Sequence, residues 1–134
     1  MEKPRRRILI VDDASNWRHT LESVLKPFGF EVVLASTIME AYEALAGKPY
    51  DAAILDVRLD SLDTSNNEGI STVLGHAHHH DPDLGFVVIS SYYSEDEVKR
   101  IVPEGVSVMY IDKNNFKTDE LVAALEQVSR SKYA

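Results

Sequence analysis

The sequence predicts a three-layer α/β/α domain built on a five-stranded parallel sheet. Short apolar segments alternate with amphipathic segments five times along the 134 residues, and this alternation favours parallel strands joined by right-handed helical crossovers. The segments Ile8–Val11 and Phe86–Ile89 are apolar without alternation, which is typical of strands covered by helices on both faces. Because the five rounds use the whole chain, we expect a single domain over residues 1–134, with a core from about 6 to 130.

The first strand and helix are expected over residues 7–11 and 15–28. Apolar side chains recur in the helix at three- and four-residue spacing, which predicts one buried face. That face comprises Trp17, Leu21, Val24, Leu25 and Phe28. Gly29 follows the last of them and is expected to end the helix, because glycine readily adopts the left-handed conformation found after helices.

The second and third strand–helix pairs have weaker sequence patterns that still predict their positions. A strand over 31–35 precedes Thr37 and Glu40, whose spacing predicts a capping box for a helix that runs to about Ala46. A third strand over 52–55 is followed by a polar stretch without periodicity at 60–68, which indicates a loop. The third helix, over about 68–78, is expected to bury Ile70, Val73 and Leu74.

The last two units complete the alternation. A strand over 85–90 is followed by Ser94 and Glu97, which cap a short helix that Pro103 and Gly105 must end. A fifth strand is expected over 107–111. The final helix, over about 118–129, presents an apolar face made of Leu121, Val122, Leu125 and Val128.

Composition excludes several classes of function. The net charge of −8 argues against a general nucleic-acid binder, because phosphate backbones require a basic face. The only basic run, Arg5–Arg7, is expected to be a solvated lead-in to the first strand. The absence of cysteine excludes disulfides and thiolate chemistry. Without a membrane-length apolar stretch or a signal peptide, we expect a soluble cytoplasmic protein.

Three aspartates follow strands that are expected to be neighbours. Asp12 and Asp13 come after the first strand, and Asp56 comes after the third. The carboxyl ends of parallel strands line one crevice, so these carboxylates are expected to converge. Converging carboxylates repel unless a cation neutralises them, and Mg2+ is the usual hard cation beside phosphate. An aspartate at the edge of such a site can also be a nucleophile toward phosphorus.

Two further residues at strand ends suit phosphoryl transfer to a carboxylate. Lys113 lies just past the fifth strand, where its ammonium can stabilise charge on phosphoryl oxygens. Ser90 ends the fourth strand, and its hydroxyl can donate a hydrogen bond to an attached phosphoryl group. These groups together indicate a site that forms an aspartyl-phosphate.

Four motifs carry a resemblance to a known family. They are ILIVDD at 8–13, AILDVRL at 53–59, FVVISS at 86–91 and YIDK at 110–113. With these motifs in this order at strand ends, the chain resembles a response-regulator receiver domain of two-component signalling. The resemblance implies a flavodoxin-like fold with strand order 2-1-3-4-5. It also implies that Asp56 accepts phosphate from a histidine kinase or a phosphotransfer protein.

The resemblance further implies a role for each site residue. Asp13, Asp56 and the backbone carbonyl of Arg58 would bind Mg2+ directly, with Asp12 holding it through water. Ser90 and Tyr110 would be the switch residues, and Arg58 and Tyr92, which flank the site, would set the phosphate lifetime. The fourth helix, fifth strand and fifth helix would contact an output domain or a second copy. Neither nucleic acid nor membrane is an expected direct partner, and the only catalysis expected is of the domain's own phosphorylation and dephosphorylation.

The chain departs from the family pattern at three places. Asp60 replaces the usual proline four residues after Asp56, and residues 60–68 resemble an insertion. Asn114 replaces the proline that normally follows the lysine. Because a non-proline cis bond costs roughly 3–4 kcal/mol, we predict a trans bond here and a less direct approach of Lys113 to the site. Pro103–Gly105 shortens the fourth helix, which predicts an unusual signalling surface.

Some residues are expected to have no special role, and three other functions are alternatives to the receiver. His76, His78, His79 and His80 are expected to be solvent-exposed, and Asp112 is expected to be a plain strand-end residue. A phosphohydrolase with an aspartyl-phosphate would need a second aspartate where Arg58 stands. A flavin carrier would need a phosphate loop less acidic than Asp12–Ser15. The remaining alternative is a receiver-like interaction module that works without phosphorylation.

Overall fold

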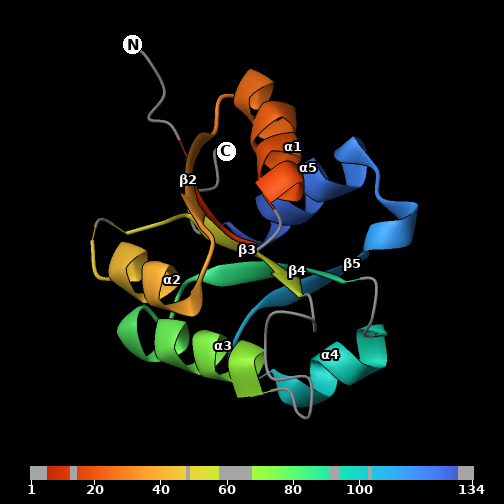
Figure 1. The fold of residues 1–134 in the computed structure, drawn as a ribbon. Helices are drawn as coiled ribbons and strands as arrows, with labels where there is room; N and C mark the ends of the chain where they lie inside the picture. Colours follow the sequence, from red (N-terminus) through yellow and green to blue (C-terminus); the bar gives the residue numbers. More distant parts are fainter. Residues whose placement is uncertain are drawn as a thin grey trace.

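A computed structural model describes residues 6–12, 15–47, 49–57, 68–90, 94–102 and 104–129. Within these residues five parallel strands form one sheet in the order β2-β1-β3-β4-β5, which confirms the predicted order (Figure 1). The strands are β1 (Arg7–Val11), β2 (Glu31–Ala35), β3 (Ala52–Val57), β4 (Gly85–Ser90) and β5 (Val108–Asp112). The helices are α1 (Ser15–Leu25), α2 (Ile38–Leu45), α3 (Glu68–His80), α4 (Glu95–Ile101) and α5 (Thr118–Val128), with 3-10 turns η1 (Lys26–Phe28) and η2 (Lys113–Asn115).

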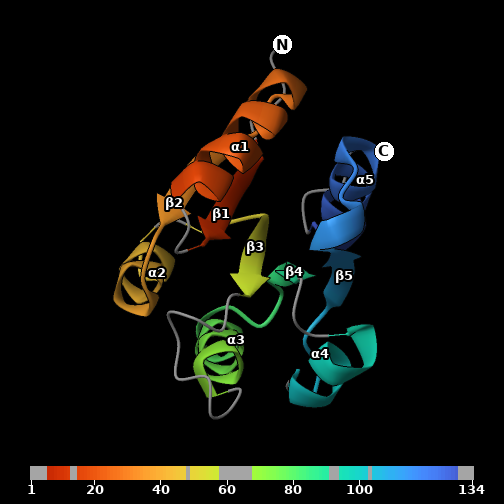
Figure 2. The same ribbon diagram turned by 45° about the vertical axis from the view of Figure 1, so that its right-hand side comes forward.

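The helices cover both faces of the sheet. Figures 1 and 2 show α1 and α5 on one face and α2, α3 and α4 on the other. Successive residues of each strand therefore point into different cores: Leu9 packs with Leu74 beneath α2 and α3, whereas Ile8 packs with Leu121 beneath α5. Burial on both faces explains why these strands are apolar without alternation.

Most predicted strand boundaries are confirmed. The bounds of β1, β2 and β4 agree with the prediction, and β5 is displaced by one residue. The strand β3 is longer than predicted, because its pairing with β4 continues through Asp56 and Val57. As a consequence, Asp56 belongs to a hydrogen-bonded strand and its backbone is fixed by the sheet.

The end of α1 differs from the prediction. Leu21 and Leu25 are buried as expected and Val24 is partly buried, but Phe28 is 54% exposed. The α-helix ends at Leu25 and continues as the η1 turn, which contains Pro27. A 3-10 turn has three residues per turn rather than 3.6, so it moves Phe28 off the buried face. Gly29 ends the turn at φ 86°, as its position in the sequence predicts.

Other core predictions are confirmed where the side chains are described. Leu74, Leu121, Leu125 and Val128 are buried, and Val122 is partly buried. Ala124 and Ala77 join these cores, although their small side chains gave no strong signal in the sequence. The side chains of Trp17, Ile70 and Val73 lie outside the described part of the chain.

The predicted caps of α2 and α4 form in two different ways. The Oγ of Ser94 accepts from the Glu97 N–H at 3.2 Å, and the Glu97 carboxylate accepts from the Ser94 N–H at 3.0 Å, which completes the box. Thr37 likewise accepts from the Glu40 N–H at 3.0 Å. The Glu40 carboxylate, however, accepts from the N–H of Ser36 at 2.6 Å, one residue earlier than in a capping box.

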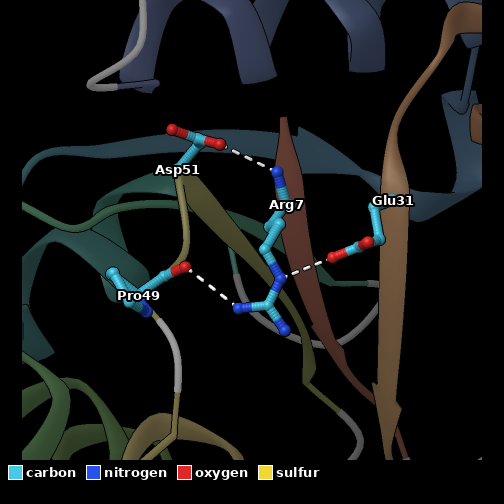
Figure 3. Close-up of polar contacts among 4 residues, drawn as sticks. All are labelled: Arg7, Glu31, Pro49 and Asp51. Carbon is cyan, nitrogen blue, oxygen red and sulfur yellow. Dashed lines mark hydrogen bonds and ion pairs between the residues drawn. The ribbon is translucent and has the colours of Figure 1, made fainter. Parts of the chain in front are cut away.

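Arg6 and Arg7, the described part of the basic run, do not form the solvated lead-in that the sequence suggested. Arg7 donates from Nε to Glu31 at 2.5 Å and from Nη1 to the carbonyl of Pro49 at 3.1 Å (Figure 3). Its backbone N–H donates to the carboxylate of Asp51 at 2.8 Å. Arg6, with a side chain only 11% exposed, forms an ion pair with Glu126 at 2.9 Å. These contacts tie β1 to β2, to the segment before β3 and to α5.

The histidines at the end of α3 are mostly exposed, as predicted. His76, His79 and His80 are exposed, whereas His78 is partly buried and its Nδ1 is enclosed. His78 is less exposed than predicted because Gly105 lies against its ring. Within the described residues these side chains form no group of metal ligands, and no described helix is long and apolar enough to cross a membrane.

Candidate functional site

Asp12 and Asp56 lie side by side at the carboxyl edge of the sheet. Val11 is the register partner of Leu55, so the residue after each of them stands at the strand spacing of about 4.8 Å. Asp12 is only 1% exposed, and the side chain of Asp56 is completely buried. The Asp12 N–H donates to the carbonyl of Ala35 at 3.0 Å, which fixes it against β2. Two predicted site carboxylates are therefore brought together in a buried position.

Lys113 reaches Asp56 directly. Its Nζ donates a hydrogen bond to Oδ2 of Asp56 and forms an ion pair with it, and its own side chain is 18% exposed. The expectation of a less direct approach was therefore wrong. The peptide bond before Asn114 is trans, as predicted, because the described chain contains no cis bond. The lysine reaches the site without the proline that normally follows it in the family.

The segment after β5 contains a feature that sequence reasoning missed. Asp112 is partly buried, and its Oδ1 accepts from the Asn114 N–H at 2.9 Å. Its Oδ2 accepts from Nδ2 of Asn115 at 3.3 Å. Asp112 is thus the N-cap of the η2 turn rather than a plain strand-end residue. This turn could have been predicted from the sequence, because an aspartate side chain readily accepts a hydrogen bond from the backbone N–H two residues later.

Ser90 and Tyr110 lie on the next two strands. Ser90 is completely buried at the end of β4, where it is the register partner of Asp112. The Tyr110 hydroxyl donates to the backbone carbonyl of Ser90 at 3.5 Å, a long and weak contact. Burial raises the pKa of Tyr110 above its ordinary value of 10.0, and the negative charges of Asp112, Glu95 and Glu97 raise it further. Tyr110 therefore stays neutral near pH 7.

The carboxylates suit a hard divalent cation. Oδ1 of Asp56 is buried and accepts no hydrogen bond within the described part of the chain. Asp12 and Asp56 place two buried carboxylates beside the Lys113 ammonium. Carboxylate oxygens are the ligands that Mg2+ prefers. The described residues contain no cluster of three or more metal-ligating side chains. Three predicted site residues, Asp13, Arg58 and Tyr92, lie outside the described part of the chain. Residues 60–67 of the predicted loop lie outside it as well.

This arrangement supports phosphoryl transfer to a carboxylate. Asp56 supplies an oxygen nucleophile, and Lys113 places a positive charge beside it. Preorganised charge at the position where phosphoryl oxygens would lie is the main requirement of such a site. Ser90, which ends β4, lies at the same end of the sheet and is the register partner of Asp112 in β5.

Comparison with known proteins gives a consistent result. A family model described as the response regulator receiver domain matches residues 8–126. A putative NtrX-like response regulator of Rickettsia bellii is 30% identical over 120 residues, which cover 90% of this chain and 24% of the relative. The chain therefore spans about a quarter of the length of this curated relative.

Solved structures share the fold along almost the whole chain. A response regulator receiver protein from Sinorhizobium medicae is 26% identical with a TM-score of 0.75, over 92% of this chain and 94% of that one. The response regulator protein TrrA from Thermotoga maritima, solved in complex with Mg2+ and BeF, is 25% identical with a TM-score of 0.74. That match covers 92% of this chain and 98% of the TrrA chain.

Proposed function

This chain belongs to the response regulator receiver domain family, and we propose that it is a phosphorylation-controlled switch whose phosphoacceptor is Asp56. The family is one of signalling domains rather than of enzymes that turn over a separate substrate. The observation that carries the proposal is the buried Asp56 carboxylate, which stands beside Asp12 and is paired with Lys113. The proposed receiver unit is a single domain.

The donor in this proposal is a phosphohistidine on a histidine kinase or a phosphotransfer protein. An oxygen of Asp56 attacks phosphorus and forms a P–O bond while the P–N bond of the donor breaks. The electron pair of that bond returns to the imidazole nitrogen of the leaving histidine. Lys113, already within hydrogen-bond reach of Asp56, stabilises negative charge on the transferred group.

Magnesium is the cofactor in this proposal. Asp12 and Asp56 would hold it together with Asp13 and the backbone carbonyl of Arg58, the latter two being carried over from the family resemblance. When bound, Mg2+ would neutralise the paired carboxylates and the charge of the phosphoryl group. The Thermotoga maritima relative solved with Mg2+ and BeF supports this choice of metal.

The proposed readout runs from Ser90 to Tyr110. The Ser90 hydroxyl would donate to the new phosphoryl group, and Tyr110, whose own hydroxyl contacts the Ser90 carbonyl, would change its side-chain conformation. Such a change would bias the surface formed by α4, β5 and α5 toward an output domain or a second copy of the chain. Arg58 and Tyr92 are the proposed determinants of phosphate lifetime.

A titration with beryllofluoride and Mg2+, followed by amide NMR, tests this function. Beryllofluoride imitates an attached phosphoryl group without requiring a phosphate donor. We expect saturable changes in the amide chemical shifts of Asp12, Asp56, Ser90 and Lys113. The amide of Tyr110 should shift with them. The Asp56→Asn variant should abolish them, and Asp83→Asn, an exposed residue in the turn before β4, should not. Unchanged spectra of the unaltered protein would favour an interaction module that works without phosphorylation.

A further inference from the structure

We propose that Asp112 is a positioning residue that holds Lys113 in place at Asp56. The inference rests on the proposed function, because Lys113 matters for phosphoryl transfer only if Asp56 accepts phosphate. Within the described part of the chain, the Asp112 carboxylate accepts from Asn114 and Asn115 rather than from Lys113. It would act through the conformation of the turn that carries the lysine.

The geometry of the η2 turn carries this inference. The Asn114 N–H donates to Oδ1 of Asp112 at 2.9 Å, and this bond closes a ring across the backbone of Lys113. Such an Asx turn restricts the dihedral angles of the residue that it encloses. The second bond, from Nδ2 of Asn115 to Oδ2 at 3.3 Å, holds the next residue of the turn to the same carboxylate.

Both ends of the turn are anchored. On one side, Asp112 is the register partner of the buried Ser90, so the sheet fixes its backbone. On the other side, Phe116 packs against the core beneath α1 and α5. Between these anchors Lys113 projects its ammonium onto Asp56. The Asp112 carboxylate therefore holds the turn that contains Lys113 to the end of β5.

The sequence explains why this restraint is needed. A lysine side chain has several rotatable bonds and is a flexible point charge, so any freedom in its backbone would add to the freedom of its ammonium. Proline would restrict that backbone, but Asn114 does not, because its φ is free. The Asx turn supplies the restraint that the proline would otherwise give. This also accounts for the direct approach of Lys113 to Asp56, which the missing proline had argued against.

Two measurements on the full chain test the proposal. The first is an NMR spectrum of lysine-labelled protein, in which the two Hε protons of a fixed Lys113 have different shifts. The second is the initial rate of phosphorylation by acetyl phosphate with Mg2+, measured over a range of donor concentrations. The variants are Asp112→Ala, which removes both contacts, and Asp112→Asn, which keeps the Oδ1 acceptor. The control is Asp83→Ala, which removes the same charge from an exposed residue in the turn before β4, at the amino end of that strand.

We expect Asp112→Ala to merge the two Hε shifts and to lower the maximal rate about tenfold, because small displacements of a positioned group have large kinetic effects. The half-saturating donor concentration should stay unchanged, and Asp112→Asn should restore most of both signals. Wild-type shifts and rate in Asp112→Ala would overturn the proposal. A loss in Asp112→Asn as large as in Asp112→Ala would also overturn it, because the charge rather than the turn would then be responsible.

The two measurements separate the failure of this proposal from the failure of the proposed function. If the unaltered protein accepts no phosphate, the proposed function fails, and the Hε shifts alone still decide whether Asp112 holds Lys113. If Asp112→Ala perturbs the fold as a whole, amide spectra will show shifts far from η2. In that case Asp112→Ser, whose hydroxyl can also cap the turn, replaces Asp112→Ala. Two different Hε shifts of Lys113 in Asp112→Ser, as in the unaltered protein, would support the proposal. Merged Hε shifts in Asp112→Ser would overturn it.

Discussion

Lys113 and Asp56 form a partly buried ion pair although they are 57 positions apart in the chain. The pair joins the end of β3 to the turn after β5, across the intervening strand β4. Asp12 stands on the other side of Asp56, so a second buried carboxylate adjoins the ion pair. The central charge balance of the site therefore depends on a contact that the fold, rather than the local sequence, creates.

Replacing Lys113 by methionine should destabilise the protein. The variant leaves the buried Asp56 carboxylate without its cation, and breaking a buried pair in this way costs about 3 kcal/mol in the free energy of unfolding. Urea unfolding measures this cost. Lys99→Met is the matched control, because Lys99 and Glu95 form an exposed pair at 3.1 Å that should contribute less than about 1 kcal/mol. Equal losses in the two variants would contradict the account of the site.

Magnesium should stabilise the folded protein through the same carboxylates. Binding to the folded state alone adds about 1.4 kcal/mol at a free Mg2+ concentration ten times Kd. Thermal unfolding with Mg2+ and with Na+ at equal ionic strength measures the increment. Asp56→Asn and Asp12→Asn should lose most of it, whereas the exposed Asp83→Asn should keep it. A gain that all three variants retain would show that the cation binds elsewhere.

Two glycine-to-alanine substitutions should change stability in opposite directions. A Cβ at Gly85 would lie 2.7 Å from the Cβ of Val128, so Gly85→Ala forces α5 away from β4 and should cost about 1–3 kcal/mol. A Cβ at Gly75, within α3, meets nothing within 4 Å. Gly75→Ala should therefore gain about 0.5–1 kcal/mol from its higher helix propensity. Chemical denaturation of both variants tests the packing, and a stable Gly85→Ala protein would refute it.

The contribution of Glu97 to stability should depend on pH. Its hydrogen bonds with Ser94, chiefly that from the backbone N–H, lower the pKa of the carboxyl below its ordinary value of 4.5. A lowered pKa in the folded state means that the stabilisation is present above 4.5 and is lost as pH falls through the folded value. The difference in unfolding free energy between wild type and Glu97→Gln should therefore shrink below pH 4.5. A difference that is independent of pH would contradict the assignment.

The parts of the fold that follow from regular periodicity could be predicted from the sequence. Asp12 and Asp56 could be paired in advance, because the ends of neighbouring parallel strands must meet. Phe28 could not be placed correctly, because periodicity assumes a continuous α-helix and Pro27 lies in a tighter turn. The contacts of Arg7 with Glu31 and Pro49 depend on where loops return to the sheet, which local patterns do not encode.

The site was only partly predictable for a similar reason. The approach of Lys113 to Asp56 depends on the conformation of one turn, and the replacement of proline by Asn114 had predicted a less direct approach. The Asx turn could have been predicted from Asp112 itself, since an aspartate after a strand readily accepts from the N–H two residues later. Its consequence for Lys113 becomes clear only when the carboxylate and the lysine are seen on the same turn.

The most direct test of the central claim is the intact mass of the protein after incubation with acetyl phosphate. The reaction is run with Mg2+ and with a chelator, on the wild type and on Asp56→Asn. The account predicts the addition of one phosphoryl group to the wild type, which requires Mg2+ and is absent from the variant. An unmodified wild-type mass, together with no response to beryllofluoride, would contradict the claim that Asp56 is a phosphoacceptor.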